Sequence, residues 1–447
     1  MLINGKLVIL QSRRIGGWTL SRGKGKMVNV DTIILGVATL IGLYMAANIG
    51  ANDLANAMGT SVGSRAITLK QAVLISVIAN LLGAVLAGTH VTETLRKGII
   101  DPNLLAGTPE KFMLGMFAAL LAAGIWVHLA TVLGQPVSTT HSIVGAVVGF
   151  GIVSVGFGAI EWGKVVSIVL SWIISPILGG VVAGGIYLLV KQKILESDSP
   201  GEAAIRYAPI LVFLVFIVLT LSLIYKGLKN LHLDFSFYSA FLIAIGVGIL
   251  AALASRWLFG RLNLESRSDR LTIGDGGHLV TESLFAYLQI MTACYVAFAH
   301  GANDVANAVG PLAAIFAVVK TKTVAAQVQV PLWMLAIGGI AVGGGLFAFG
   351  TRVMETIGKN ITEITPVRGF CAEFGAATTI LVCSRMGLPI STTHVLVGSV
   401  VGIGVVRGME ALDLRLIKNI LISWFITLPF TIILAIIIYE TMLHLFY

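Results

Sequence analysis

Long apolar segments alternate with short polar loops along most of the chain. Each segment approaches the roughly 20 residues that an α-helix needs to cross the hydrocarbon core of a membrane. The segments near Phe370 and Val395 are shorter than a full span. This pattern predicts an all-α polytopic membrane protein of about twelve transmembrane helices. They begin near Asp31, Ala72, Phe112, Ser142, Val165, Ala208, Ser236, Ser283, Pro331, Phe370, Val395 and Asn419.

Composition agrees with a membrane protein. Of the 447 residues, 57% are hydrophobic and only 11% are charged, against roughly 25% charged in soluble domains. The formal charge of +9 comes from Lys and Arg in short loops rather than from one patch, which indicates membrane orientation and argues against nucleic acid. The three cysteines form no CxxC pair, so no metal site or disulfide framework is expected.

The ends and loops give a prediction of orientation. Residues 1–26 hold six basic and no acidic residues and no apolar run long enough for a signal peptide or a span, so they are interpreted as a disordered or non-native tail. Lys and Arg are equally divided between the two faces when this tail is counted. Without the tail, the count places the termini outside a cell (inner) membrane and the loop Arg256–Glu282 in the cytoplasm.

Two motifs each occur twice. GANDLANAMG, Gly50 to Gly59, returns as GANDVANAVG, Gly301 to Gly310, and GQPVSTTH, Gly134 to His141, returns as GLPISTTH, Gly387 to His394. The copies lie 251 and 253 residues apart, counted from Gly50 to Gly301 and from Ser138 to Ser391. A shorter match, Gly-Thr-x-Val-x-Glu-Thr, contains Glu93 and Glu355 and is interpreted as interfacial ion pairing. The chain is therefore an internal duplication.

The duplication predicts the domain organisation. Repeat 1 covers residues 27–190 with five spans, residues 191–282 hold two linking spans and a cytoplasmic loop, and repeat 2 covers residues 283–447 with five spans. Seven spans then separate the starts of the repeats, and an odd number inverts one repeat relative to the other. Inverted repeats are a recurring plan of secondary transporters, which hold substrate near the membrane midplane.

The PxSTTH segments predict helix starts, since proline ends the preceding pattern and hydroxyl residues cap the next helix. Their loops carry no Lys or Arg, which favours the tips of two re-entrant helical hairpins near residues 134–141 and 387–394. A helix N-terminus with hydroxyl donors suits an anion such as a tetrahedral oxyanion. An ordinary helix cap in a connecting loop is the alternative. The candidate phosphate-binding residues are Ser138, Thr139, Thr140, Ser391, Thr392 and Thr393.

The GAND segments offer carboxylate and amide oxygens, which suit a hard cation such as Na⁺, while an Asp alone could carry a proton. On a regular helix Asn52 and Asn56 share a face and Asp53 lies about 100° away, so all three line one cavity only if the helix opens. The glycines of both copies favour such an opening. A polar packing cluster between helices is the alternative. The candidate cation ligands are Asn52, Asp53, Asn56, Asn303, Asp304 and Asn307.

Three further residues are candidates for coupling or gating. His141 and His394 close the hairpin motif, where capping or orienting a hydroxyl is favoured over carrying a proton. Glu373 is a lone acid in an apolar run, and its counterpart in the first half is Leu120. Any role of Glu373 is therefore asymmetric.

The duplicated GANDxANA, the duplicated PxSTTH and the stretch Thr89 to Asp101 resemble the inorganic phosphate transporter (Pit) family. The resemblance covers essentially everything from Met27 onward and implies twelve membrane segments in two inverted repeats. It also implies phosphate contacts from the hairpin hydroxyls, cation ligands from the GAND segments and a role for Glu373 in phosphate transport. A glutamate of eukaryotic members is Asn80 here, and the short loop between the halves is similar to prokaryotic members.

The predicted function is symport of inorganic phosphate with a cation, Na⁺ being favoured, by alternating access. Bound cations would lower the cost of placing a doubly negative anion in a low-dielectric site. The alternatives are an H⁺-coupled phosphate, metal-phosphate or sulfate symporter and a passive anion channel. An intramembrane hydrolase is disfavoured because every candidate Ser, His and Asp is duplicated, whereas a nucleophile needs only one activated copy. No enzyme activity and no cofactor is therefore expected. The expected partners are phosphate, sodium ions and the lipid bilayer, with a homodimer as one possible assembly.

Overall fold

The computed structural model describes residues 2–3, 6–7, 30–87, 99–227, 235–259, 276–324, 328, 330–386 and 390–446. Strands Leu2–Ile3 (β1) and Lys6–Leu7 (β2) pair antiparallel; the rest of the predicted tail lies outside the described residues, as does most of the loop Arg256–Glu282. The principal helices are α1 (Val30–Ile49), α2 (Ala55–Gly63), α3 (Leu69–Ala87), α5 (Pro109–Val132), α6 (Thr139–Val155), α7 (Trp162–Val190), α8 (Pro200–Ser222), α9 (Phe237–Phe259), α10 (Gly276–Thr321), α11 (Leu332–Phe349), α12 (Thr351–Glu355), α13 (Pro366–Arg385), α14 (Thr392–Arg407) and α15 (Leu414–Phe446).

Short π-helices and 3₁₀-helices join these elements. The π-helices are η1 (Gly50–Leu54), η4 (Lys191–Leu195), η5 (Leu223–Gly227) and η8 (Thr356–Asn360). The 3₁₀-helices are η2 (Pro102–Leu105), η3 (Phe157–Ala159) and η9 (Met409–Ala411). Of these segments, η1 and η8 both pack against α2.

Each of the twelve predicted spans corresponds to a helix, but they are not all full spans. Within the described residues, nine helices are long and apolar enough to cross a membrane. The segments predicted near Ser142 and Val395 are α6 and α14, with only 17 and 16 residues. The segment near Phe370 is α13, which carries a charge at each end and Glu373 between them. These three helices, together with α5, form the arms of two hairpins: hairpin 1 is α5 and α6, and hairpin 2 is α13 and α14.

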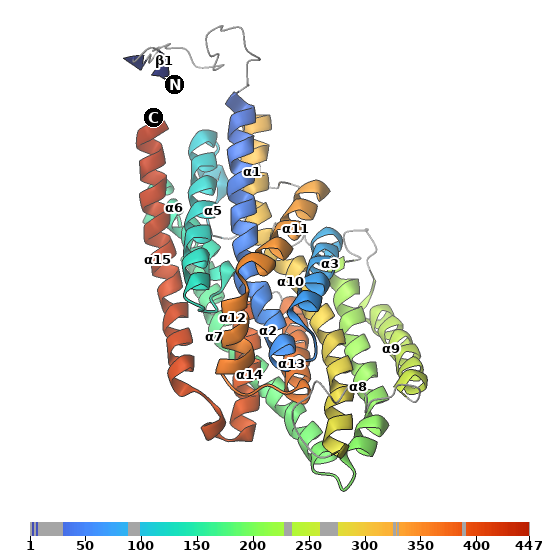
Figure 1. Ribbon diagram of the computed structural model, residues 1–447. Helices are drawn as coiled ribbons and strands as arrows, with labels where there is room; N and C mark the ends of the chain where they lie inside the picture. Colours follow the sequence, from blue (N-terminus) through green and yellow to red (C-terminus); the bar gives the residue numbers. More distant parts are fainter. Residues whose placement is uncertain are drawn as a thin grey trace.

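The two halves run in opposite directions. The first GAND copy lies in η1 and α2, directly after α1, and the second lies within α10. Lys322, just after α10, lies 3.0 Å from the Asp31 carboxylate at the start of α1. At the other end, Ser64, after α2, donates to Gln289 of α10 at 2.7 Å. The corresponding helices are therefore antiparallel. Figure 1 shows hairpin 1 entering from the end that holds both termini and hairpin 2 entering from the opposite end.

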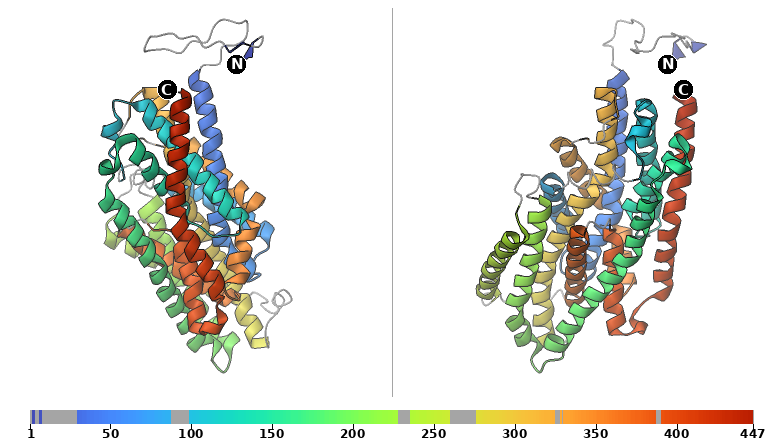
Figure 2. Two further views of the ribbon diagram at one scale, coloured as in Figure 1. Left: turned by 90° about the vertical axis from the view of Figure 1, so that its left-hand side faces the viewer. Right: turned by 180° about the vertical axis from the view of Figure 1, so that it is seen from behind.

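The halves exchange their packing partners. Helix α6 packs against α15, and its counterpart α14 packs against α7. In the same way α3 packs against α10, and α11 packs against α1. In the view from behind, the red α15 lies along one edge of the molecule beside the teal and green helices of hairpin 1 (Figure 2). The two hairpin tips therefore meet inside the protein.

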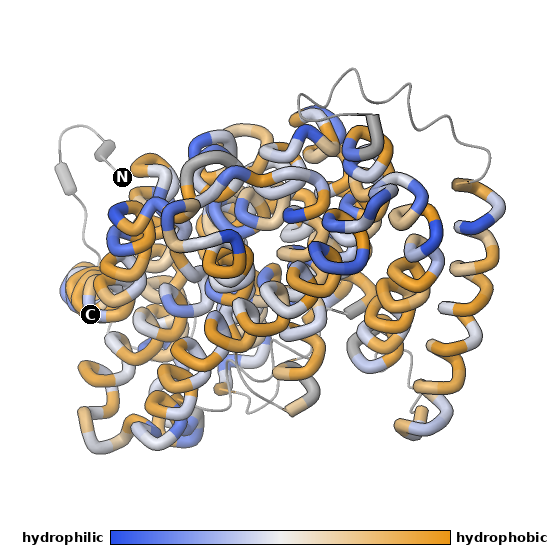
Figure 3. The backbone as a smooth tube through the Cα atoms, turned by 90° about the horizontal axis from the view of Figure 1, so that it is seen from below, coloured by the Kyte–Doolittle hydropathy of each residue, from blue (hydrophilic) through white to orange (hydrophobic). Residues whose placement is uncertain are grey.

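The outer surface is suited to lipid. Large apolar side chains are exposed on the peripheral helices, among them Val181, Leu250 and Phe425. Hydrophobic residues predominate along these helices (Figure 3). Apolar surface on this scale would aggregate in water, so the protein is an integral membrane protein of the all-α class.

Glycines of the GAND motif allow close packing of helices. A Cβ at Gly50 would lie 1.7 Å from the Val342 carbonyl oxygen of α11, and a Cβ at Gly301 would lie 2.0 Å from the Asn80 carbonyl oxygen of α3. The two contacts correspond to each other in the two halves. Asn80 itself donates to the Gly339 carbonyl at 3.1 Å, so it ties α3 to α11.

Gly50→Ala should destabilise the protein by about 1–3 kcal/mol, the usual cost of overpacking. The added methyl group would meet main-chain atoms, which cannot rotate away. Gly344→Ala in α11 is the matched control, because nothing lies within 4 Å of its added Cβ. Thermal unfolding of both variants in detergent measures the difference. Equal melting temperatures for Gly50→Ala and the parent protein would contradict the packing argument.

Candidate functional site

The first GAND copy opens the helix that carries it. Residues Gly50–Leu54 form the π-helix η1 between α1 and α2, and π-helices widen the turn and often occur at functional sites. The predicted opening is confirmed for this copy. It is wrong for the second copy, because α10 is continuously α-helical through Asn303 and Asp304. Gly301 is instead explained by the close packing of α10 against α3.

Both PxSTTH segments begin helices as predicted. Ser138 caps α6, and its Oγ accepts a hydrogen bond from the His141 N–H at 3.2 Å. Ser391 caps α14 in the same way, with the His394 N–H at 3.2 Å. Both serines are buried. Two helix N-termini, each the positive end of a helix dipole, therefore lie inside the protein.

Asp53 joins the two hairpin tips. Its carboxylate accepts a short hydrogen bond from Thr139 Oγ1 of hairpin 1 and a second bond, 2.7 Å long, from Thr393 Oγ1 of hairpin 2. Asp304 accepts from Thr392 Oγ1 at 3.0 Å. Both aspartates are buried. The structure thus brings the predicted cation ligands and the predicted phosphate ligands into direct contact.

Two asparagines reach across to the opposite repeat. Asn56 Nδ2 donates to Thr393 Oγ1 at 3.1 Å. Asn307 Nδ2 donates to the hydroxyl oxygens of Thr139 and Thr140, each at 3.2 Å. Each GAND segment therefore contacts the hairpin tip of the other half.

Asn52 has a different position from its neighbours. Its Nδ2 donates to Thr131 Oγ1 and to the Gln135 carbonyl, both at 3.0 Å, and its Oδ1 accepts from the Val137 N–H at 3.0 Å. The amide thus holds the turn of hairpin 1. Asn303, at the equivalent position, is half-buried. Cation binding by these two residues stays a prediction.

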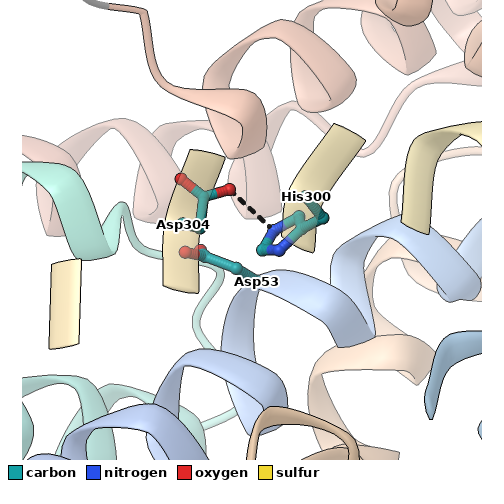
Figure 4. A group of neighbouring side chains, drawn as sticks. All are labelled: Asp53, His300 and Asp304. Atoms are coloured by element: carbon teal, nitrogen blue, oxygen red, sulfur yellow. Dashed lines mark ion pairs between the residues drawn. The ribbon is translucent and has the colours of Figure 1, made fainter. Parts of the chain in front are cut away.

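His300 is a site residue that the sequence reasoning missed. One ligand atom from each of Asp53, His300 and Asp304 lies within 4.8 Å of the others, and all three side chains point to one place (Figure 4). His300 Nε2 lies 3.1 Å from Asp304 Oδ2. The available signal was its spacing, one helical turn before Asp304. The equivalent position in the first half is Ile49, so the site is asymmetric.

The site around Asp53 and Asp304 has little free volume, and holding two buried carboxylates close together is energetically unfavourable. The cavity lined by Asp53, Asn56, His300 and the threonines of hairpin 2 has a volume of about 10 Å³, close to the minimum for one water molecule. Two neighbouring carboxylates in such surroundings repel each other and have lost their hydration, so a bound cation or a proton would stabilise them. Oxygen-rich, buried and acidic surroundings suit a small hard cation.

Glu373 is the centre of a second polar cluster. Its fully buried carboxylate accepts hydrogen bonds from Thr60 at 2.7 Å, Ser61 at 2.6 Å, Thr292 at 2.5 Å and Gln289 at 3.2 Å. The donors come from α2 and α10, the helices of the two GAND copies. Its counterpart Leu120 is a core residue, so the asymmetry expected from the sequence is present in the structure.

His141 and His394 lie in a stack of four rings. His141 stacks on Trp172 with ring centroids 3.3 Å apart, His394 stacks on Trp424 at 3.5 Å, and the two imidazoles meet edge-to-face at 4.3 Å. His394 Nδ1 also lies 3.1 Å from the Trp172 carbonyl oxygen. Among the described contacts, the imidazole rings orient no hydroxyl; they join hairpin 1 to hairpin 2.

Inverted halves with buried carboxylates where two helix N-termini meet are the plan of a membrane transporter rather than an enzyme. The chain belongs to the phosphate transporter family, whose family model matches residues 49–435. The resemblance seen in the sequence is thereby confirmed, and phosphate is the transported substrate.

Individual relatives cover nearly the whole chain. A protein of Pyrococcus abyssi described as a phosphate permease is 44% identical over 401 residues, which are 90% of this chain and 96% of that protein. The chloroplastic inorganic phosphate transporter 2-1 of Arabidopsis thaliana is 41% identical over 435 residues, covering 92% of this chain and 73% of that protein. A solved structure described as the sodium-dependent phosphate transporter is 39% identical, with a TM-score of 0.83, and covers 93% of this chain and 100% of that one.

Proposed function

We propose that this protein is a Na⁺-coupled symporter of inorganic phosphate that works by alternating access. The name of the solved relative, a sodium-dependent phosphate transporter, supports Na⁺ as the coupling ion. H⁺ coupling is the second candidate, and the observation that favours it is His300 beside Asp304, because an imidazole readily exchanges a proton. The protein acts in the cell membrane, with its termini outside.

One observation carries the coupling mechanism: the hairpin threonines donate their hydroxyl protons to the aspartates. A threonine hydroxyl has a single O–H, so Thr139 and Thr393 cannot donate to Asp53 and to phosphate at the same time. A cation at Asp53 and Asp304 would replace these donors. The released hydroxyls would then turn toward the anion, so cation binding completes the phosphate site.

The phosphate ligands would come from both halves. Ser138 and Ser391 use their oxygens as helix caps, which leaves their O–H groups available as donors. The N–H groups of the first turns of α6 and α14 add to them. The anion is then held by neutral donors from two inverted hairpins, and the bound cations compensate its charge.

Glu373 has a supporting role in this proposal. Its carboxylate is surrounded by hydroxyl and amide groups that also carry oxygen atoms, so they too can ligate a cation. The cluster joins α2, α10 and α13, so a cation or a proton on Glu373 would change how hairpin 2 packs against the two GAND helices. Glu373 thereby links coupling to hairpin position.

Replacing Na⁺ by choline should lower phosphate uptake into proteoliposomes by at least about tenfold, since roughly 1.4 kcal/mol of lost coupling energy is sufficient for that change. Uptake is measured with labelled phosphate at several pH values. Uptake that follows a pH gradient without Na⁺ would favour H⁺ coupling, and uptake indifferent to both gradients would indicate a channel. Competition by a tenfold excess of sulfate would contradict selectivity for phosphate.

A further inference from the structure

The repeated Gly-Thr-x-Val-x-Glu-Thr motif has no part in the mechanism so far. Its second copy, Gly350 to Thr356, comprises the N-cap of α12, α12 itself and the first residue of η8. Its side chains contact the turn of hairpin 1. The first copy, Gly88 to Thr94, lies outside the described residues.

Two side chains of this copy bind the main chain of hairpin 1. Arg352 Nη1 donates to the Val132 carbonyl oxygen at 2.5 Å, and Thr356 Oγ1 donates to the Gly134 carbonyl oxygen at 2.8 Å. The two residues are one helical turn apart, and their acceptors are two residues apart. We call Arg352 and Thr356 the α12 latch.

The two carbonyl groups that the α12 latch binds lie at the end of α5 and in the turn that follows it. Val132 is the last residue of α5, and the final carbonyl groups of a helix have no intrahelical partner. They also form the negative end of the helix dipole, which a guanidinium complements. Gly134 has a φ of +67°, a conformation that turns the chain sharply and suits glycine. The α12 latch therefore fixes the point where hairpin 1 reverses.

The latch lies between the surface and the site. Val132 and Leu133 are 45% and 64% exposed, whereas Val137 and Thr139 are fully buried. Between these residues the Gln135 carbonyl binds Asn52 of η1, and the Pro136 carbonyl accepts from Trp424 Nε1 of α15 at 2.9 Å. Moving inward from the exposed end, the contact with α12 comes first and the contact between Thr139 and Asp53 comes last.

We infer that Arg352 and Thr356 are positioning residues that hold the tip of hairpin 1 closed over the site, and that the pathway opens on this side when they release the Val132 and Gly134 carbonyls. This inference rests on the alternating-access transport proposed above. Two hydrogen bonds to main-chain carbonyls can be broken and remade without disturbing an apolar core. Hairpin 1 also packs against α15 and α1 through buried interfaces that include hydrogen bonds, such as that from Trp126 Nε1 to Thr427 Oγ1, and close-packed interfaces of this kind resist such movement.

Thiol accessibility tests this inference without requiring transport. Val137→Cys is introduced after Cys294, Cys371 and Cys383 are replaced by alanine. Right-side-out and inside-out membrane vesicles are treated with a charged, membrane-impermeant thiol reagent. In the parent protein the buried thiol should react slowly from both faces. Combining Arg352→Gln with Thr356→Val should raise its rate of modification at least about tenfold, the effect of losing one net hydrogen bond, and from one face only.

The controls separate opening from loosening of the whole fold. Arg352→Lys keeps a donor for the Val132 carbonyl, so the thiol should stay protected. Arg415→Gln and Thr441→Val change exposed residues near the two ends of α15 and should have no effect. A second reporter, Ala435→Cys in the buried face of α15, should react slowly in every variant. If the double variant does not purify, the single variants provide the same test.

Unchanged protection of Val137→Cys in folded latch variants would overturn the inference, and so would equal acceleration from both faces or at Ala435→Cys. The result is independent of the uptake assay. Accelerated labelling with Na⁺-independent uptake would keep the latch and reject Na⁺ coupling. Normal Na⁺-dependent uptake without accelerated labelling would keep the proposed function and reject the latch.

Discussion

Asp53→Asn is expected to lower Na⁺-driven phosphate uptake at least about tenfold, since it removes one full charge from a buried site. The substitution preserves the size of the side chain and keeps acceptor capacity for one threonine. It removes the charge that would attract the cation and release Thr139 and Thr393 to phosphate. Labelled phosphate uptake at increasing Na⁺ concentrations measures the change, and any residual uptake should no longer depend on Na⁺.

The matched control is Asp31→Asn. Asp31 lies at the start of α1, the helix that precedes η1 and Asp53. It forms a surface ion pair with Lys322, and such pairs contribute little to stability. Uptake by this variant should equal that of the parent protein. Asp304→Asn should behave like Asp53→Asn. Normal Na⁺-dependent uptake in both buried variants would remove these acids from the mechanism.

Thr393→Val should raise the phosphate concentration needed for half-maximal uptake about tenfold or more, because valine keeps the volume but removes the hydroxyl. The Thr393 hydroxyl donates to Asp53 and accepts from Asn56, so its loss leaves a buried amide without that acceptor as well as removing a phosphate donor. Uptake kinetics at saturating Na⁺ measure the effect. The expected result is a change in apparent affinity that exceeds the change in maximal rate.

Two variants check that the hydroxyl is responsible. Thr393→Ser restores it and should recover most of the affinity for phosphate. Thr441→Val removes an exposed hydroxyl that donates to the Ile437 carbonyl oxygen within α15, so it should have no effect. If Thr393→Val and the parent protein have the same apparent affinity, the hairpin hydroxyls are not phosphate ligands, and the helix N-termini alone would have to bind the anion.

Helix caps and other local features could be predicted from the sequence because their motifs occur twice. Serine before two threonines after proline predicts a helix cap wherever it occurs, and both Ser138 and Ser391 form one. The antiparallel halves followed from the number of apolar segments between the motif copies. Lengths were less certain: α6 and α14 resembled spans in composition but are hairpin arms.

Contacts between residues far apart in the sequence could not be predicted in the same way. His300 lies within an apolar run and has no counterpart in the first half, so repetition gave no signal for it. The donors to Glu373 come from helices more than 80 residues away in sequence. The binding of Arg352 to a main-chain carbonyl leaves no pattern at all, since every residue has a carbonyl.

The sequence by itself determined the class of protein, the duplication and the helix caps of the two hairpins, because hydrophobic length, spacing and capping are local properties. Only the tertiary structure decided that GAND and PxSTTH residues share their hydrogen bonds. That sharing depends on α1 and α10 lying antiparallel and on hairpins from opposite ends meeting at Asp53. The physical reason is that a hydroxyl proton binds one acceptor at a time. The tertiary structure decides which acceptor lies within hydrogen-bond distance.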